Sequence, residues 1–261
     1  MSNLETLQLR VQVHLSYGLI DEMYVKTNLL SCVPRLSRLS VFIQSYLCLS
    51  LIQSNLSIAE NIQKSSRRFS KDFLISYGDY FQEANQVQYL LCSMPCGSDF
   101  FHGISNRFPG GRFNNVRRVS LYDEKPFEQE FFLHISKCFP RMKQLFVVNH
   151  KAQNRRQSDQ LTNDDQNVSP IVYAHLRLLN LVDVHNHYIE EFLLDRKCQY
   201  VQDFTLQIKY QSLEYVIHHL SKDETRINSN KVTELCFRCK HSRSYRVQEY
   251  FPRAKILQEC F

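Results

Sequence analysis

The sequence is short of the residues that several common folds require. It has 6 Gly and 7 Pro among 261 residues, which is few for an all-β fold built on many tight turns. Neither GxGxxG nor GxxxxGK[ST] occurs, so the phosphate-binding loops of nucleotide enzymes are not indicated. No run approaches the roughly 18 apolar residues of a membrane-spanning helix, and we therefore expect no membrane partner.

The first residues also lack the marks of a secretory signal. The stretch SNLETLQLRVQVHL after Met1 is interrupted by polar residues and has neither a basic start nor an apolar core. The 9 cysteines are odd in number and irregularly spaced, which predicts reduced thiols rather than a disulfide framework. Together these features predict a cytoplasmic or nuclear protein.

A degenerate repeat runs through the chain. Its template is L-x-x-L-x-L, with any apolar residue allowed at the three L positions. The copies are LETLQL from Leu4, LSRLSV from Leu36, VQYLLC from Val87, VRRVSL from Val116, MKQLFV from Met142, LRLLNL from Leu176, VQDFTL from Val201, VTELCF from Val232 and a weaker AKILQE from Ala254. Apart from one gap of 51 residues, which leaves room for a hidden unit between Val41 and Val87, successive copies start 22 to 34 residues apart. This is near the period of about 20–29 residues of leucine-rich repeats.

Between the copies, apolar residues recur at helical spacing. The helical stretches are IDEMYVKTNLL (20–30), KPFEQEFFLHISKCF (125–139), HYIEEFLLDRK (187–197) and SLEYVIHHL (212–220). The predicted apolar face of the first stretch carries Ile20, Met23, Tyr24 and Leu30, and that of the second carries Phe127, Phe131, Ile135 and Cys138 or Phe139. Each unit is thus predicted to be a strand, a corner and a helix. We predict an α/β fold, a leucine-rich-repeat solenoid or horseshoe forming a single domain over 1–261, with parallel strands on the concave face and helices on the convex face. A doubly wound sheet is the alternative, but the shared spelling of FPRMK and FPRAK favours repeats.

Two polar stretches interrupt the pattern. Residues 149–170 are nearly free of apolar side chains, which predicts an exposed loop of a composition typical of disorder. Residues 63–72 form a second, basic loop.

A net charge of +6 permits nucleic-acid binding without indicating it. The candidates for weak nucleic-acid binding are Arg67, Arg68, Lys71, Arg155 and Arg156.

The C-terminal third, from Tyr173 to Leu257, contains the stretches HYIEEFLLDRK, YQSLEYVIHHLSKDETRINSNKVTELCF and EYFPRAKIL. These stretches resemble the leucine-rich-repeat region of F-box-domain-containing proteins. In that family an F-box of three helices binds a Skp-type adaptor of a cullin ubiquitin ligase, and the repeats capture the protein to be ubiquitinated. The resemblance therefore implies substrate recognition for such a ligase. No F-box-like run of Leu-Pro and amphipathic helices occurs in this chain, so we expect adaptor binding only if an F-box lies upstream.

Motifs that suggest metal or nuclease chemistry have simpler explanations. The adjacent His185, Asn186 and His187 follow a repeat strand, whereas a ββα-metal nuclease spreads its histidines over a hairpin and a helix. We interpret them as the corner between a strand and a helix. Cys236, Cys239 and His241 resemble half of a zinc site, but no second half is evident. We expect no enzymatic activity, and no catalytic, cofactor-binding or metal-binding residues.

Side chains beside each strand leucine should point away from the core, because strand side chains alternate. In the middle units these outward positions are aromatic and apolar, and in the end units they are polar, as in a protein-binding surface. The residues predicted to bind a protein partner on the concave face are Tyr89, Leu91, Arg118, Ser120, Tyr122, Gln144, Phe146, Val148, Leu178, Asn180 and Val182. An interaction scaffold with no ubiquitin link is the main alternative function.

Overall fold

The computed structural model describes residues 5–15, 20–32, 35, 37–48, 67–68, 74–154, 169–237 and 245–258. The chain divides into two compact units, where we expected one repeat domain over 1–261. Unit 1 consists of Met1–Asp99 and Arg107–Asn115, and unit 2 consists of Phe100–Asn106 and Val116–Phe261. The two units differ in how their strands pair.

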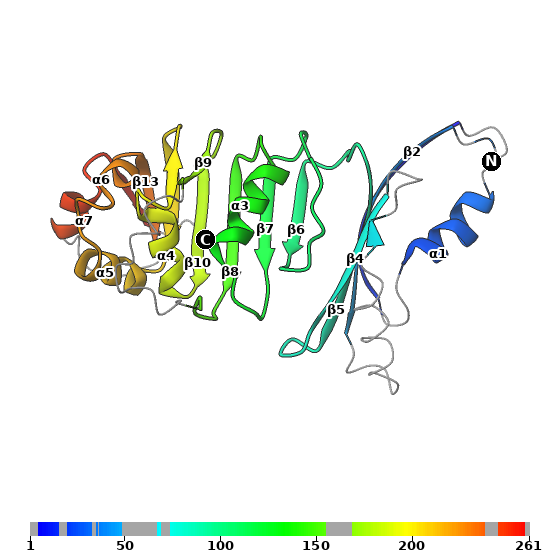
Figure 1. Cartoon of the computed structure of the whole chain (residues 1–261), viewed down its shortest axis with the longest axis horizontal. Helices are drawn as coiled ribbons and strands as arrows, with labels where there is room; N and C mark the ends of the chain where they lie inside the picture. The colour runs from blue at the N-terminus through cyan, green and yellow to red at the C-terminus, as the bar shows by residue number, and fades with distance from the viewer. Residues whose placement is uncertain are drawn as a thin grey trace. The chain divides into compact units, whose positions relative to one another are not determined.

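Unit 2 is built on a parallel sheet of seven strands (Figure 1). In spatial order, which is also chain order, the strands are β6 (Phe100–Ile104), β7 (Arg118–Tyr122), β8 (Gln144–Asn149), β10 (Leu178–Val184), β12 (Phe204–Ile208), β13 (Val232–Phe237) and β14 (Lys255–Gln258). Every neighbouring pair is parallel. The predicted mixed α/β class and the parallel pairing of the repeat strands from Val116 onward are confirmed.

Described helices follow β7, β10, β12 and β13 along the chain. Three of them lie in the stretches of predicted helical periodicity: α3 (Gln129–Cys138), α4 (Asn186–Leu193) and α5 (Tyr210–His219). The short helices α6 (Arg226–Ser229) and α7 (Tyr245–Tyr250) were not predicted. Figure 1 shows α3 and α4 in front of the same face of the sheet. Two short strands, β9 (Ile171–Tyr173) and β11 (Cys198–Tyr200), pair in parallel as a separate small sheet.

In the middle strands β8, β10 and β12 of the unit 2 sheet, buried side chains alternate with partly exposed ones. The inward positions are in register across five neighbouring strands, so they make a continuous apolar row. This row is Val119, Leu145, Leu179, Leu206 and Leu235. All five side chains are fully buried, and this burial supplies the apolar contact that a single strand–helix unit lacks.

An aromatic cluster joins the helices to one another. Phe132 of α3 packs edge-to-face on Phe127, Tyr188 and Phe192, with ring centroids 5.9, 6.0 and 4.9 Å away. The backbone N–H of Phe127 donates to the Tyr188 hydroxyl over 3.0 Å. Here the predicted helix face needs correction, because α3 begins at Gln129 and turns Phe132 inward rather than Phe131.

Unit 1 contains a mixed sheet of five strands. They are β1 (Thr6–Leu15), β2 (Arg38–Cys48), β3 (Arg67–Arg68), β4 (Leu74–Phe81) and β5 (Gln86–Ser93), in the spatial order β1-β2-β5-β4-β3. Only β1 and β2 are parallel; the other neighbours are antiparallel. The parallel arrangement predicted for the VQYLLC copy is therefore wrong. The chain reverses between β4 and β5 through a tight turn, in which Asn85 has a φ of 48° and donates its N–H to the Gln82 carbonyl.

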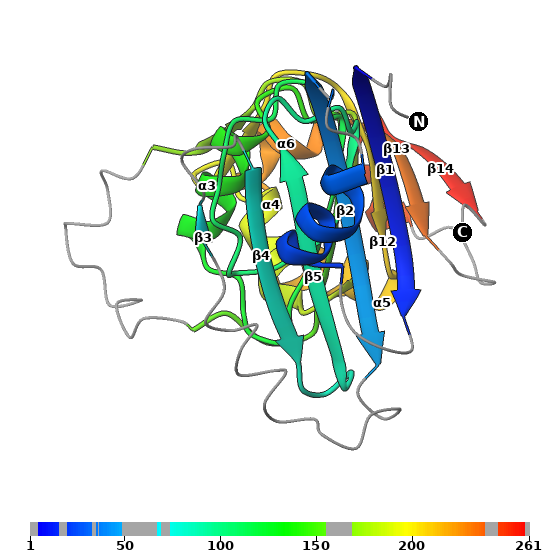
Figure 2. The same cartoon turned by 90° about the vertical axis from the view of Figure 1, so that its right-hand side faces the viewer.

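A short helical segment covers one face of the unit 1 sheet (Figure 2). It starts with α1 (Glu22–Tyr24) and continues to Cys32. Val25 packs into the core of the sheet, whereas Met23 and Tyr24 are exposed. Met23 and Tyr24 were expected on the buried face, so that expectation is wrong.

The predicted loop over 149–170 is described only at its ends. Asn149 belongs to β8 and is buried, with its amide donating to the Lys125 carbonyl over 2.7 Å. Its inclusion in an exposed loop is therefore a wrong boundary. Residues 155–168 lie outside the described residues, as do residues 49–66 and 69–73 of the gap in which a hidden repeat was expected.

Candidate functional site

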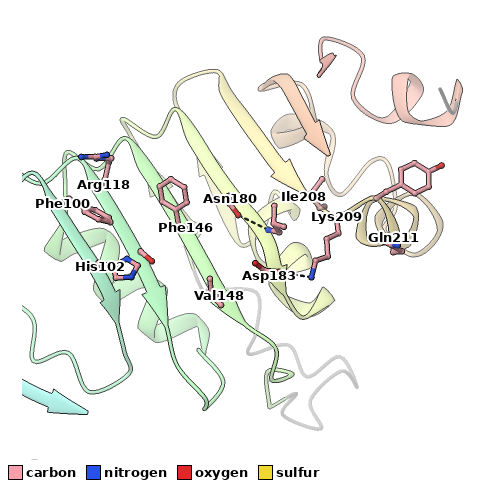
Figure 3. A pocket seen from close by; sticks show the side chains of 13 residues that line it. Phe100, His102, Arg118, Phe146, Val148, Asn180, Asp183, Ile208, Lys209 and Gln211 are labelled. Atoms are coloured by element: carbon pink, nitrogen blue, oxygen red, sulfur yellow. Dashed lines mark hydrogen bonds and ion pairs between the residues drawn. The ribbon is translucent and has the colours of Figure 1, made fainter. Parts of the chain in front are cut away.

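A hollow of about 680 Å³ lies on the unit 2 sheet (Figure 3). It is on the open face, which we define as the side of this sheet away from α3 and α4. The lining residues come from β6, β7, β8 and β10 and from the stretch in which β12 ends and α5 begins. They are Phe100, His102, Arg118, Ser120, Phe146, Val148, Asn180, Val182, Asp183, Ile208, Lys209, Tyr210 and Gln211.

Strand alternation places most of these side chains on the open face. On β8, Leu145 and Val147 are buried toward the helices, while Phe146 and Val148 remain partly exposed on the other side. The same alternation on β10 exposes Asn180 and not its neighbours. The predicted partner-binding residues that the structure brings together in the hollow are Arg118, Ser120, Phe146, Val148, Asn180 and Val182.

Three other predicted residues, Tyr122, Gln144 and Leu178, lie next to the hollow without lining it. All three are partly buried. Gln144 is in register with Arg118 on one side and Leu178 on the other, so these side chains share one row across the open face. Ser120 lines the hollow but is buried, so little of its side chain is accessible to a partner.

Tyr89 and Leu91 do not belong to this surface. Both lie on β5 in the middle of the unit 1 sheet, with exposures of 5% and 0%, and they pack in a core with Val25, Val41 and Ile43. Their predicted exposure is wrong because β5 is paired on both edges and the helical segment covers this face.

Hydrogen bonds and ion pairs fix several side chains around the hollow (Figure 3). The Asn180 amide donates to the Gln207 Oε1 atom over 2.6 Å, and its own oxygen accepts the Val182 N–H over 3.1 Å. The Lys209 ammonium lies 3.0 Å from the Asp183 carboxylate. These contacts hold polar groups in place around the apolar side chains.

Arg118 and Phe100 form the end of the hollow opposite the Lys209–Asp183 pair (Figure 3). The guanidinium carbon of Arg118 lies 5.0 Å from the centroid of the Phe100 ring, within the range of a cation–π contact. The neighbouring His102 has its pKa lowered by desolvation, so we expect its imidazole to be neutral at pH 7. Arg118 is thus the principal positive charge at this end.

The repeat template missed the lining residues of β6 and α5. In β6, Phe101 and Ile104 have the spacing of the first two apolar template positions, but the polar Asn106 stands at the third. The spacing of Phe101 and Ile104, both fully buried, is the signal that could have found this strand. Tyr210 and Gln211 were missed because only Lys209 separates β12 from α5, which brings the start of the helix beside the strand end.

The HNH stretch is a corner, as predicted. Strand β10 ends at Val184 and α4 begins at Asn186. The His185 ring nitrogen Nδ1 accepts the backbone N–H of His187 over 3.2 Å, which caps the helix start. In the part of the chain that the structure describes, no group of three His, Cys, Asp or Glu residues is placed to hold a metal ion.

The candidates for zinc and nucleic-acid binding fall largely outside the described residues. Cys236 is buried in β13, whereas Cys239 and His241 are not described. The same holds for Lys71, Arg155 and Arg156, and for the side chains of Arg67 and Arg68.

No helix among the described residues is long and apolar enough to cross a membrane. Comparisons with protein-family models, with curated proteins and with solved structures find no match for the chain. The geometry of the open face is therefore the basis on which a function can be proposed.

Proposed function

We propose that the chain is a leucine-rich-repeat-like solenoid that binds another protein on the open face of unit 2. The observation that carries this proposal is the hollow itself, which lies on the face of the sheet away from α3 and α4. A sheet normally buries its apolar residues under a second layer. Here Phe100, Phe146, Val148 and Val182 instead line a hollow that is open to a partner.

The strand order supports the solenoid part of the proposal. A doubly wound sheet reverses its strand order at a switch point, whereas the strands of unit 2 follow one another in chain order from β6 to β14. Consecutive stacking of strand–helix units is the defining arrangement of a solenoid.

The chemistry of the hollow supports protein as the class of partner. Its centre is apolar and aromatic, and its margins carry Arg118, Asn180 and the Lys209–Asp183 pair. Interface hot spots combine aromatic side chains and arginine in this way, surrounded by polar groups.

We expect Phe146→Asp to reduce the recovery of bound proteins at least tenfold, because buried aromatic anchors contribute about 2 kcal/mol or more to binding. The measurement is quantitative mass spectrometry of proteins that co-purify with the tagged chain from cells. The matched control is Val172→Asp on β9, a strand of the separate small sheet, where the side chain is already 54% exposed. Equal recovery with wild type and Phe146→Asp would remove the open face as the binding surface.

Within this proposal, the module supplies substrate recognition to an F-box-type ubiquitin ligase. Support for this step is the sequence resemblance between Tyr173 and Leu257, which lies within unit 2. We expect the full-length gene product to co-purify with a Skp-type adaptor. If the adaptor is absent while substrate proteins are still recovered, the chain acts as an interaction scaffold without a ubiquitin link.

A further inference from the structure

Two cysteines of unit 1 are in contact where β5 ends. They belong to the stretch CSMPC, in which Cys92 is a residue of β5 and Cys96 follows it at C-x3-C spacing. The Cys92 thiol donates a hydrogen bond to the Cys96 sulfur, and both are free cysteines rather than halves of a disulfide. Two sulfurs in hydrogen-bond contact need little side-chain movement to form a disulfide.

Strand register places a positive charge on the same side of the sheet. Arg10 of β1 is paired with Phe42 of β2, and Phe42 is paired with Cys92, so the three residues form one row across a single face. The segment after β5 crosses this row. Within that segment, Cys96 contacts Cys92, and Asp99 forms an ion pair with Arg10 over 2.9 Å.

The surroundings of Cys96 favour its thiolate form. The hydrogen bond from Cys92 is the largest contribution, and the Ser98 backbone N–H donates a second hydrogen bond to the Cys96 sulfur over 3.4 Å. The positive charge of Arg10 acts in the same direction, so the pKa of the Cys96 thiol is lowered despite its burial. Because the thiolate is the nucleophilic form of cysteine, Cys96 is the attacking sulfur of the pair.

Cys92 has the opposite character. The hydrogen bond that it donates to Cys96, together with its complete burial, raises the pKa of the Cys92 thiol well above its usual value. Cys92 therefore remains protonated while Cys96 reacts. A thiol held against a reactive cysteine is the arrangement of a resolving cysteine, which converts a sulfenic acid into a disulfide.

Cys96 lies just below the surface, where a small oxidant can reach it. Its exposure is only 4%, but Pro95, Gly97 and Asp99 of the same segment are exposed. The segment packs closely on the sheet, since a Cβ atom on Gly97 would lie 2.9 Å from the Ser40 Oγ atom of β2. A small uncharged oxidant such as hydrogen peroxide suits this site better than a bulky reagent does.

We propose that Cys92 and Cys96 are a modification site at which hydrogen peroxide forms a reversible disulfide. The Cys96 thiolate attacks one peroxide oxygen, the O–O bond breaks and hydroxide leaves, which gives a sulfenic acid on Cys96. The Cys92 sulfur then attacks the Cys96 sulfur, the S–S bond forms, and the hydroxyl group leaves as water with the Cys92 proton. The two cysteines lose two electrons, which the peroxide gains. This site lies in unit 1 and does not depend on the proposed binding face of unit 2.

Peptide mapping of the full chain identifies the product. No Lys or Arg occurs from residue 72 to residue 106, so trypsin releases residues 72–107 as one peptide whose only cysteines are Cys92 and Cys96. The chain is treated with hydrogen peroxide, denatured, alkylated with iodoacetamide and digested. We expect this peptide to lose two hydrogens and to carry no alkyl group. Dithiothreitol added before alkylation should restore both alkylated thiols.

Cys198 is the control for general oxidation. Its thiol is fully buried, and desolvation raises its pKa well above the usual value. It lies in a separate tryptic peptide, residues 198–209. We expect the 72–107 peptide to be oxidised at least about tenfold faster than Cys198, because thiolate character and exposure govern oxidation of cysteine.

Variants separate the attacking thiol from the resolving thiol. In Cys92→Ser the sulfenic acid on Cys96 should persist and be trapped by dimedone, whereas in Cys96→Ser dimedone should leave Cys92 unlabelled. Arg10→Gln should slow disulfide formation about threefold by removing a charge that favours the thiolate, and Arg10→Lys, which keeps the charge, should restore the rate. Circular dichroism of each variant confirms that its fold is retained.

Two results would overturn the proposal. One is a wild-type 72–107 peptide that remains alkylated on both cysteines after peroxide treatment. The other is oxidation of this peptide no faster than that of Cys198. Dimedone labelling of Cys92 in Cys96→Ser, without labelling of Cys96 in Cys92→Ser, would overturn the assignment of Cys96 as the attacking thiol.

Discussion

Replacing Phe132 by alanine should lower the free energy of unfolding of unit 2 by about 3–5 kcal/mol. The Phe132 side chain is fully buried and contacts aromatic rings from both α3 and α4. Its removal leaves a cavity between the two helices that the surrounding rings cannot fill without leaving their edge-to-face geometry. Native-state hydrogen exchange of peptides from α3 and α4, read by mass spectrometry, measures the loss locally.

Two controls make this result specific to the aromatic cluster. Phe132→Leu keeps most of the volume and should cost no more than about 1.5 kcal/mol. Leu133→Ala, on the same helix but at a partly exposed position, should cost less than about 1 kcal/mol. A Phe132→Ala loss as small as that of Leu133→Ala would show that the cluster does not hold the helices together.

Replacing Lys197 by methionine should lower the free energy of unfolding by about 3 kcal/mol. The Lys197 ammonium lies 2.8 Å from the Glu191 carboxylate, and the two side chains are 28% and 1% exposed. Methionine keeps most of the unbranched apolar side chain and removes the ammonium group, which leaves the Glu191 carboxylate buried without its cation. An uncompensated buried charge is among the most costly changes in a folded protein.

The double variant Lys197→Met with Glu191→Gln separates charge from packing. An amide costs less to bury than a carboxylate, so we expect the double variant to recover at least about 1 kcal/mol over Lys197→Met. Lys197→Arg retains the positive charge and should lie within about 1 kcal/mol of wild type. Urea denaturation followed by circular dichroism ranks the variants. If Lys197→Met unfolds like wild type, the ion pair contributes nothing to the stability of unit 2.

The repeat template located strands well, because it depends on alternation alone. Each of its copies falls on a strand of unit 1 or unit 2. Alternation does not distinguish a parallel strand from one strand of a hairpin, however, since both bury every second side chain. The copy from Val87 illustrates this limit: Gln82–Asn85 makes a tight reversal without a glycine, so no turn signal marked β5 as antiparallel.

The candidate site was predictable where one face of a strand is covered and the other is open. Phe146 and Asn180 meet that condition, and the structure places both in the hollow. Tyr89 and Leu91 do not meet it, because side chains on both faces of β5 are buried. Leu90 and Cys92, which alternate with them along the strand, are as buried as they are. A single strand carries no information about what packs on its second face. Lys209, Tyr210 and Gln211 reach the hollow through the short β12–α5 connection, which is a tertiary effect.

The chain-ordered strands of unit 2 bear on how such a module can change its size. Seven strands about 4.8 Å apart give a face roughly 29 Å across. Since each strand pairs only with its predecessor and successor, tandem duplication of one strand–helix segment widens the face by about 4.8 Å and leaves the existing pairings intact. The reach of the proposed binding surface can therefore evolve by whole segments, while the chemistry of the hollow evolves separately through residues such as Arg118 and Phe146.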